Sequence, residues 1–203
     1  MTTFDKLVAY FEKFPGVGVR QAKRFAFHVL TMKREQVTEL SDLISSLSNS
    51  VTECLICHRF FSYGQSSTCQ ICNDQNRDIQ KLLVVASDND IQAIERSGTY
   101  NGLYFVLGGT IPLMSKALDQ KLRGGAFRVL VTEKIKNDDL EVILGFAVNP
   151  DGENTARYIE SLLSEFASTG KIKISHLGRG LSTGSELEYA DAETIKSALR
   201  NRV

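Results

Sequence analysis

The four cysteines of this chain all lie in one short segment, as Cys54-x2-Cys57 and Cys69-x2-Cys72 with eleven residues between the pairs. Each pair presents two thiolates from one tight turn, and four sulfurs complete the tetrahedral shell that Zn²⁺ prefers. A complete shell leaves no position for water or substrate, which argues against catalysis by the metal. The polar stretch 62–67 cannot build a core of its own, so the sequence predicts a zinc finger that metal binding folds.

Two other interpretations of the cysteines stay open. A pair of disulfides requires an oxidising compartment, and a redox-active Cys-x-x-Cys usually follows a strand of a sheet. His58, next to Cys57, is a spare ligand candidate. Because four cysteines suffice for the shell, we expect His58 at the surface.

Charge and hydropathy limit the classes of function. Lys and Arg total 24, as do Asp and Glu, so the chain of 203 residues has no net charge and any nucleic-acid contact must come from a local patch. The N-terminus lacks a basic segment followed by an apolar one, and apolar runs such as 142–148 are too short to cross a bilayer. We therefore expect a cytoplasmic protein without a membrane partner.

The first 34 residues read as two amphipathic helices around a glycine-rich turn. Phe4, Leu7, Val8 and Phe11 form one apolar stripe, and a second runs from Ala22 to Leu30. The turn is Phe-Pro-Gly-Val-Gly at 14–18, which ends the first helix and leaves backbone amides bare at the start of the second. Bare amides at a helix N-terminus favour an anion. A third helix over 37–47 is expected to complete a small bundle.

Positive charge is concentrated beside that turn, because residues 13–34 contain six lysines and arginines and no acid. We expect this hairpin to bind DNA through the phosphate backbone, irrespective of sequence. The predicted DNA-binding residues are Gly16, Gly18, Arg20, Lys23 and Arg24. An ordinary helical hairpin with a solvated basic face, or a dimerisation surface, remains an alternative.

After Cys72 short apolar runs alternate with helical patterns, which indicates an α/β domain with a mostly parallel sheet. Strands are expected near 82–86, 104–107, 142–148 and 171–175, with helices near 90–96 and 154–166. The segment 127–135 fits either a strand or a helix.

Acidic side chains follow two of these strands, where ligands of such sheets collect. They could hold Mg²⁺, although carboxylates at these positions are also common helix caps, the interpretation we favour. The polar residues concerned are Asp88, Asp90, Asn149, Asp151 and Glu153.

In the order of these parts, the chain resembles members of the bacterial recombination mediator family RecR over essentially its whole length. The segments that carry the resemblance are 14–28 (FPGVGVRQAKRFAFH), 93–104 (AIERSGTYNGLY), 106–109 (VLGG) and 179–191 (RGLSTGSELEYAD). The resemblance implies a multidomain α/β protein: a helix-hairpin-helix domain at 1–51, a C4 zinc finger at 52–76, a Toprim domain at 79–176 and a C-terminal oligomerisation segment at 177–203.

The resemblance further implies a non-enzymatic clamp that acts in recombinational DNA repair with RecO and RecF homologues. It implies a homo-oligomer, a dimer or a tetrameric ring, joined through the N-terminal and C-terminal parts. Physical reasoning also favours an oligomer, because several copies of a modest basic patch bind more tightly together.

Two positions depart from the family pattern. Ala86 stands where Toprim domains usually carry a Glu, and the loop 149–153 is shorter than in the family. Because Ala86 removes the natural acid of Toprim catalysis, we expect no catalytic residues. Gly178, Gly180 and Gly184 do not form a nucleotide-binding fingerprint and are expected in turns of a C-terminal interface.

Two further functions compete with DNA binding by a repair mediator. One is a Mg²⁺-dependent Toprim nuclease or primase-like enzyme that uses the carboxylates above. The other is a scaffold in which the hairpin and the zinc finger serve assembly alone.

Overall fold

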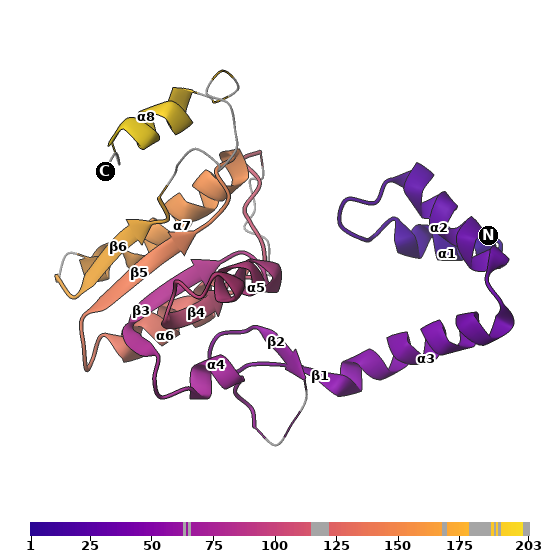
Figure 1. Cartoon of the computed structure of the whole chain (residues 1–203), viewed down its shortest axis with the longest axis horizontal. Coiled ribbons are helices and arrows are strands. Elements are labelled where there is room, and N and C mark those ends of the chain that lie inside the picture. The colour runs from indigo at the N-terminus through magenta and orange to yellow at the C-terminus, as the bar shows by residue number, and fades with distance from the viewer. Residues whose placement is uncertain are drawn as a thin grey trace. The chain divides into compact units, whose positions relative to one another are not determined.

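The computed structural model describes residues 1–62, 64, 66–114, 122–167, 170–178, 188, 190 and 192–200 (Figure 1). The chain forms two compact units, residues 1–52 and residues 53–203. Most of the family-like segment 179–191 lies outside the described residues, and so do Gly180 and Gly184.

The first unit is built on a hairpin of helices α1 (Thr3–Phe11) and α2 (Val19–Thr31). Its small core consists of Val8, Ala22 and Ala26, and Phe4, Leu7 and Phe11 of α1 pack against it. Alanines four residues apart lie on the same face of α2 and let the two helices approach closely. The predicted helical hairpin is therefore confirmed.

Helix α3 (Arg34–Ser50) forms as predicted but does not complete a bundle. In the described structure none of its residues is buried. Its apolar stripe, Leu40, Leu43, Ile44 and Leu47, is 40 to 66% exposed. The bundle expectation was wrong because the periodicity of a stripe shows that a helix has an apolar face, not that its own chain covers that face.

The second unit contains a four-stranded parallel sheet in the order β4-β3-β5-β6. A two-stranded sheet, β1-β2, includes β1 (Val51–Glu53), which spans the boundary between the two units. The other elements of the second unit, in chain order, are β2 (Phe60–Ser62), α4 (Gln70–Asn73), β3 (Asp78–Val85), α5 (Asp88–Ser97), β4 (Gly102–Val106), α6 (Gly124–Lys134), β5 (Leu140–Gly145), α7 (Pro150–Ala167), β6 (Ile172–His176) and α8 (Ala192–Arg200). The mixed α/β class and the parallel sheet are both confirmed.

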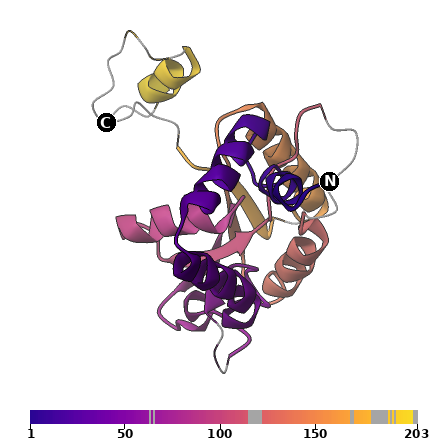
Figure 2. The ribbon, with the colours of Figure 1, turned by 90° about the vertical axis from the view of Figure 1, so that its right-hand side faces the viewer.

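Both faces of the four-stranded sheet are covered. Leu82 and Val84 of β3 point to the core beneath α6 and α7, while Leu83 and Val85 point to a second core with α5 and three of the cysteines. Figure 2 shows α5 on one side of the sheet and α6 and α7 on the other. A strand covered on both faces reads as a continuous apolar run, as 82–85 does.

Two local predictions change with the structure. The ambiguous segment 127–135 belongs to α6, whose Phe127 and Val131 are buried against the sheet. The strand expected over 142–148 ends at Gly145, because the chain turns there toward α7. Gly152 allows this turn, since a Cβ at that position would lie 2.0 Å from the carbonyl oxygen of Ala147.

Candidate metal centre and nucleic-acid interface

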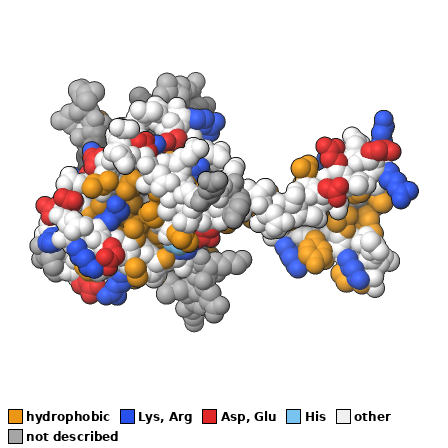
Figure 3. All heavy atoms as spheres, turned by 90° about the horizontal axis from the view of Figure 1, so that it is seen from below, with side chains coloured by type: hydrophobic (Ala, Val, Ile, Leu, Met, Phe, Trp, Pro, Cys, Tyr) orange, Lys and Arg blue, Asp and Glu red, His pale blue; other side chains and the backbone are white. Residues whose placement is uncertain are grey.

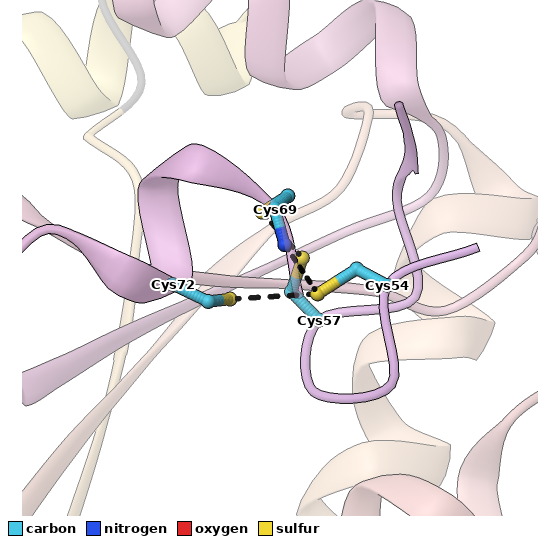
Figure 4. A group of neighbouring side chains, drawn as sticks. All are labelled: Cys54, Cys57, Cys69 and Cys72. Atoms are coloured by element: carbon cyan, nitrogen blue, oxygen red, sulfur yellow. Dashed lines mark hydrogen bonds between the residues drawn. The ribbon is translucent and has the colours of Figure 1, made fainter. Parts of the chain in front are cut away.

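The four cysteine sulfurs lie within 4.8 Å of one another, and Figure 4 shows all four side chains converging on one point. Sγ of Cys54 is 3.8 Å from Sγ of Cys72, and Sγ of Cys57 is 3.5 Å from Sγ of Cys69. Zn–S bonds of about 2.3 Å in a tetrahedron place sulfurs about 3.8 Å apart. The four thiols are free, so the disulfide interpretation is wrong and the cluster could hold a metal ion.

The surroundings of the cluster suit thiolates. Cys54, Cys57 and Cys69 are at most 1% exposed, and the amide of Cys69 donates a hydrogen bond to Sγ of Cys54 at 3.3 Å. Hydrogen bonding to Cys69 and burial raise the pKa of Cys57, whereas hydrogen bonds with Cys57 and Cys72 lower the pKa of Cys69 against the raising effect of its burial. The thiols thus cannot all ionise together unless a cation neutralises them.

The cysteine module packs on the sheet and shares its core. Cys54, Cys57 and Cys69 belong to the same apolar cluster as Leu83 and Val85 of β3. The amide of Val106, at the end of β4, donates a 2.8 Å hydrogen bond to the carbonyl oxygen of Cys57. The position of the metal centre is therefore fixed by the α/β unit.

A charged link joins the module to α6. Nδ1 of His58 lies 2.5 Å from Oε1 of Glu53, and Nε of Arg123 donates to the same oxygen at 3.1 Å. Burial acts to raise the pKa of Glu53, but the hydrogen bonds from His58 and Arg123 outweigh it and leave this pKa lowered. His58, expected at the surface, packs its ring edge-on against Phe105 instead.

The carboxylates considered for Mg²⁺ have structural partners. Asp88 accepts a 2.8 Å hydrogen bond from the amide of Phe60 in β2, and Asp90 forms a capping box with Ser87. Asp151 accepts from the amide of Leu113 at 2.9 Å. Over the described ranges, only the four cysteines form a group that could hold a metal ion, which favours the capping interpretation.

Three side chains of α7 hold the loop that follows β4. Besides Asp151, Thr155 accepts a 2.8 Å hydrogen bond from the amide of Ile111, and Asn154 donates to the carbonyl oxygen of Ile111 at 3.3 Å. Thr155 is fully buried. Nothing in the sequence signalled these two contacts with Ile111, because the partners are more than forty residues apart and the groups contacted on Ile111 are backbone atoms.

The hairpin of the first unit has the expected backbone. Gly16 has a φ of 75°, a left-handed conformation that suits glycine, and the amide of Val17 closes the turn by donating to the carbonyl oxygen of Phe14. Gly18 is the N-cap of α2 and has no side chain to accept from the first turn. That turn contains no acidic residue either, so within residues 1–52 no side chain caps these amides.

Arg20, Lys23 and Arg24 lie exposed in the first two turns of α2, and no ion pair involves them in the part of the chain that the structure describes. Lys23 interacts electrostatically with Asp5 of α1. Hydrogen bonds from Thr2 lower the pKa of Asp5 most, and the charge of Lys23 adds to this effect. The structure thus brings the bare amides and the cations together on one helix.

A second charged cluster, which sequence reasoning missed, lies beside α5. Glu95 accepts two hydrogen bonds from Arg77, at 2.8 and 2.5 Å, and one from the hydroxyl of Tyr104 at 2.6 Å. Glu95 and Tyr104 fall within the family-like segment 93–104. The cluster ties the chain leaving the cysteine module to α5 and β4, which accounts for three charged or polar residues in an otherwise apolar layer.

Fold and sites together define a helix-hairpin-helix protein with a four-cysteine module and a Toprim α/β domain. Family models match in that order: "RecR, helix-hairpin-helix" at residues 4–47, "Toprim domain" at 80–177 and "RecR, C-terminal" at 180–203. The chain is 35% identical to the recombination protein RecR of Lactobacillus helveticus over 197 residues, 97% of this chain and 94% of that protein. It is also 35% identical to recombination protein RecR of Staphylococcus aureus, over 98% of this chain and 95% of that protein. The chain belongs to the RecR family of recombination proteins.

None of the helices in the described part of the chain combines the length and the hydropathy needed to cross a bilayer.

Proposed function

We propose that this protein is a DNA-binding recombination mediator in recombinational DNA repair. The observation that carries the proposal is the coincidence, on α2, of uncapped amides after Gly18 with the exposed cations Arg20, Lys23 and Arg24. Amides and cations arranged in this way suit a phosphate backbone and do not read bases. The family model for the helix-hairpin-helix covers the same residues.

The metal of the cysteine centre is proposed to be structural Zn²⁺, held by Cys54, Cys57, Cys69 and Cys72. Four buried sulfurs at these separations match tetrahedral zinc, and an all-sulfur shell has no open position. When bound, zinc would supply the positive charge that lets the four thiols ionise together. Its role would be to hold the module against β3 and β4, where Cys57 already accepts the amide of Val106.

The proposed partners are further copies of this chain and homologues of RecO and RecF. The family resemblance supports all three. The exposed apolar stripe of α3 supports self-association independently, because large apolar surfaces of this kind usually mark a protein contact. A ring that presents several hairpins would bind DNA more tightly than one subunit with three exposed cations.

The observations do not favour the Mg²⁺-dependent nuclease or primase. Ala86 stands at the position of the Toprim acid, and the carboxylates of Asp88 and Asp151 accept backbone hydrogen bonds. Mg²⁺-dependent nicking or primer synthesis by the purified protein, abolished by Asp151→Ala, would reinstate that function.

The DNA-binding proposal is tested by Arg20→Ala combined with Arg24→Ala. Each lost phosphate contact lowers the slope of log affinity against log salt by about 0.9, so the double variant should bind more weakly with a slope shallower by nearly 2. Affinity is measured by fluorescence anisotropy of labelled DNA over a salt series.

Arg128→Ala with Arg157→Ala is the matched control, because it removes the same charge from exposed sites on α6 and α7. The control should retain most of the affinity of the parent. If the hairpin variant bound as tightly as the parent at every salt concentration, the assignment of the hairpin would be wrong.

A further inference from the structure

We propose that the basic face of α2 binds single-stranded nucleic acid and that Phe27 stacks against one of its bases. The inference rests on the proposed DNA binding and specifies which form of DNA the hairpin prefers. It concerns a residue that the phosphate-binding role of the hairpin does not use.

The placement of Phe27 is the first observation. Arg20, Lys23, Arg24 and Phe27 are spaced i, i+3, i+4, i+7, so they form one stripe along α2. The core residues Ala22 and Ala26 lie on another side of the helix. On the face of the first unit that Figure 3 draws, lysine and arginine side chains lie beside hydrophobic ones.

The second observation is the setting of the ring. Phe27 is 58% exposed, and its ring packs against Phe4 of α1 with the centroids 4.8 Å apart and the planes at 51°. One side of the ring is therefore supported while much of the rest faces solvent. Phe25, by contrast, is only 36% exposed and meets Phe11 edge-on with the ring centroids 5.8 Å apart.

An exposed aromatic ring among cations suits a single strand better than a duplex. In a duplex the faces of the bases are stacked on one another, and a contact to the phosphates needs only charge and amides. In a single strand the bases can turn outward and stack on aromatic side chains while cations follow the backbone. The stripe offers both kinds of contact within two turns of one helix.

A second copy of this chain fits the stripe less well. A two-fold symmetric contact through this surface would bring Arg20, Lys23 and Arg24 against the same three cations of the other copy. Like charges across an interface oppose association. The apolar stripe of α3, whose four residues carry no charge, is better suited to such a contact.

The test compares Phe27→Ala and Phe27→Leu with the parent, using oligo(dT) and a blunt duplex of equal length at one salt concentration. The affinity of both variants for oligo(dT) should fall roughly five- to 150-fold, the loss measured when a stacked aromatic is removed. Leu retains apolar contact with Phe4 but has no aromatic face. Affinity for the duplex should stay within about twofold, and Phe25→Leu should bind both ligands like the parent.

A direct readout is available because the chain contains no tryptophan. In Phe27→Trp the single indole should be quenched by oligo(dT) and not by the duplex. If the parent binds neither ligand, the proposed function itself fails. If the parent binds but the Phe27 variants lose nothing, or lose both ligands equally, the stacking inference alone is overturned. A lower mass in solution for Phe27→Leu would also overturn it, since the stripe would then be a subunit contact.

Discussion

At the scale of single residues, Glu95 illustrates how charge is used in the α/β unit. Its carboxylate is only 29% exposed and accepts hydrogen bonds from Arg77 and Tyr104. The bond from Arg77 lowers the pKa of Glu95, against the raising effect of burial. Burial, and then the bond to Glu95, raise the pKa of Tyr104, so its hydroxyl remains a donor. Removing Glu95 would leave Arg77 without this partner.

We expect Glu95→Gln to lower the free energy of unfolding at pH 7 by about 1.5–3 kcal/mol, as for a lost hydrogen bond to a charged group. The pKa of Glu95 is lower in the folded than in the unfolded chain. The stabilisation by Glu95 is therefore complete above the pKa of this group in the unfolded chain, about 4.3. It is lost as the pH falls through the lower pKa of Glu95 in the folded chain.

Denaturant unfolding at pH 7 and at a series of acidic values measures both effects. The Gln variant should lose less stability on acidification than the parent. The control is Glu133→Gln, which removes a carboxylate paired with Lys136. Because the two side chains of this pair are 58 to 62% exposed, the substitution should change the free energy of unfolding by at most about 0.5 kcal/mol. Equal losses in the two variants would contradict the role of the Glu95 cluster.

At the scale of elements, the cysteine module is part of the core of the α/β unit. Loss of the metal should therefore weaken both. We expect Cys57→Ser to lose one equivalent of metal per chain and to lower the free energy of unfolding by at least about 3 kcal/mol, or Tm by about 6–12 °C.

Metal content by mass spectrometry and thermal unfolding by circular dichroism test this expectation. Ser62→Ala, in β2 but outside the cluster, is the control and should keep its metal. A metal-free Cys57→Ser protein that unfolded at the temperature of the parent would show that the module contributes nothing to the α/β core.

Local signals predicted much of the elements, but not their contacts. Three signals depend only on residues close together in the chain: the cysteine spacing, the continuous apolar run 82–85 and the Phe-Pro-Gly-Val-Gly turn. The structure contains the cysteine cluster, the strand and the helical hairpin that these signals predicted. The sequence of α6 fitted a strand as well as a helix because it contains β-branched residues. In the structure this segment is a helix, and its Phe127 packs against the sheet.

Contacts between segments that lie far apart in the chain could not be predicted from the sequence pattern. Asp88 was considered for a metal, yet it binds the backbone of β2, 28 residues earlier. A backbone amide that donates in this way can belong to almost any residue, so no side-chain type marks it. Likewise, the stripe of α3 predicted a helix correctly and could not say what lies against it.

At the scale of the whole molecule, the exposed stripe of α3 bears on assembly. We expect Leu43→Glu with Leu47→Glu to lower the mass of the protein in solution, because two charges would have to be buried at the proposed contact between copies. Multi-angle light scattering measures the mass. The division of the chain into four domains, with a C-terminal oligomerisation segment at 177–203, also remains a prediction.

Thr38→Glu with Ser45→Glu adds the same charge to the opposite side of α3 and should leave the mass unchanged. If both double variants had the same mass in solution as the parent, α3 would not be a contact between copies. If both reduced it equally, the effect would come from charge and not from the apolar stripe.

The order β4-β3-β5-β6 also determines how the nascent chain matures on the ribosome. The central strand β3 is synthesised before both of its neighbours, and β5 must emerge before the second edge of β3 is paired. Until then an apolar strand with open backbone groups remains available to other chains. Emergence of β5, which ends at Gly145, is therefore the step that closes the second edge of β3, and a delay between the emergence of β4 and that of β5 would prolong the exposure of this edge.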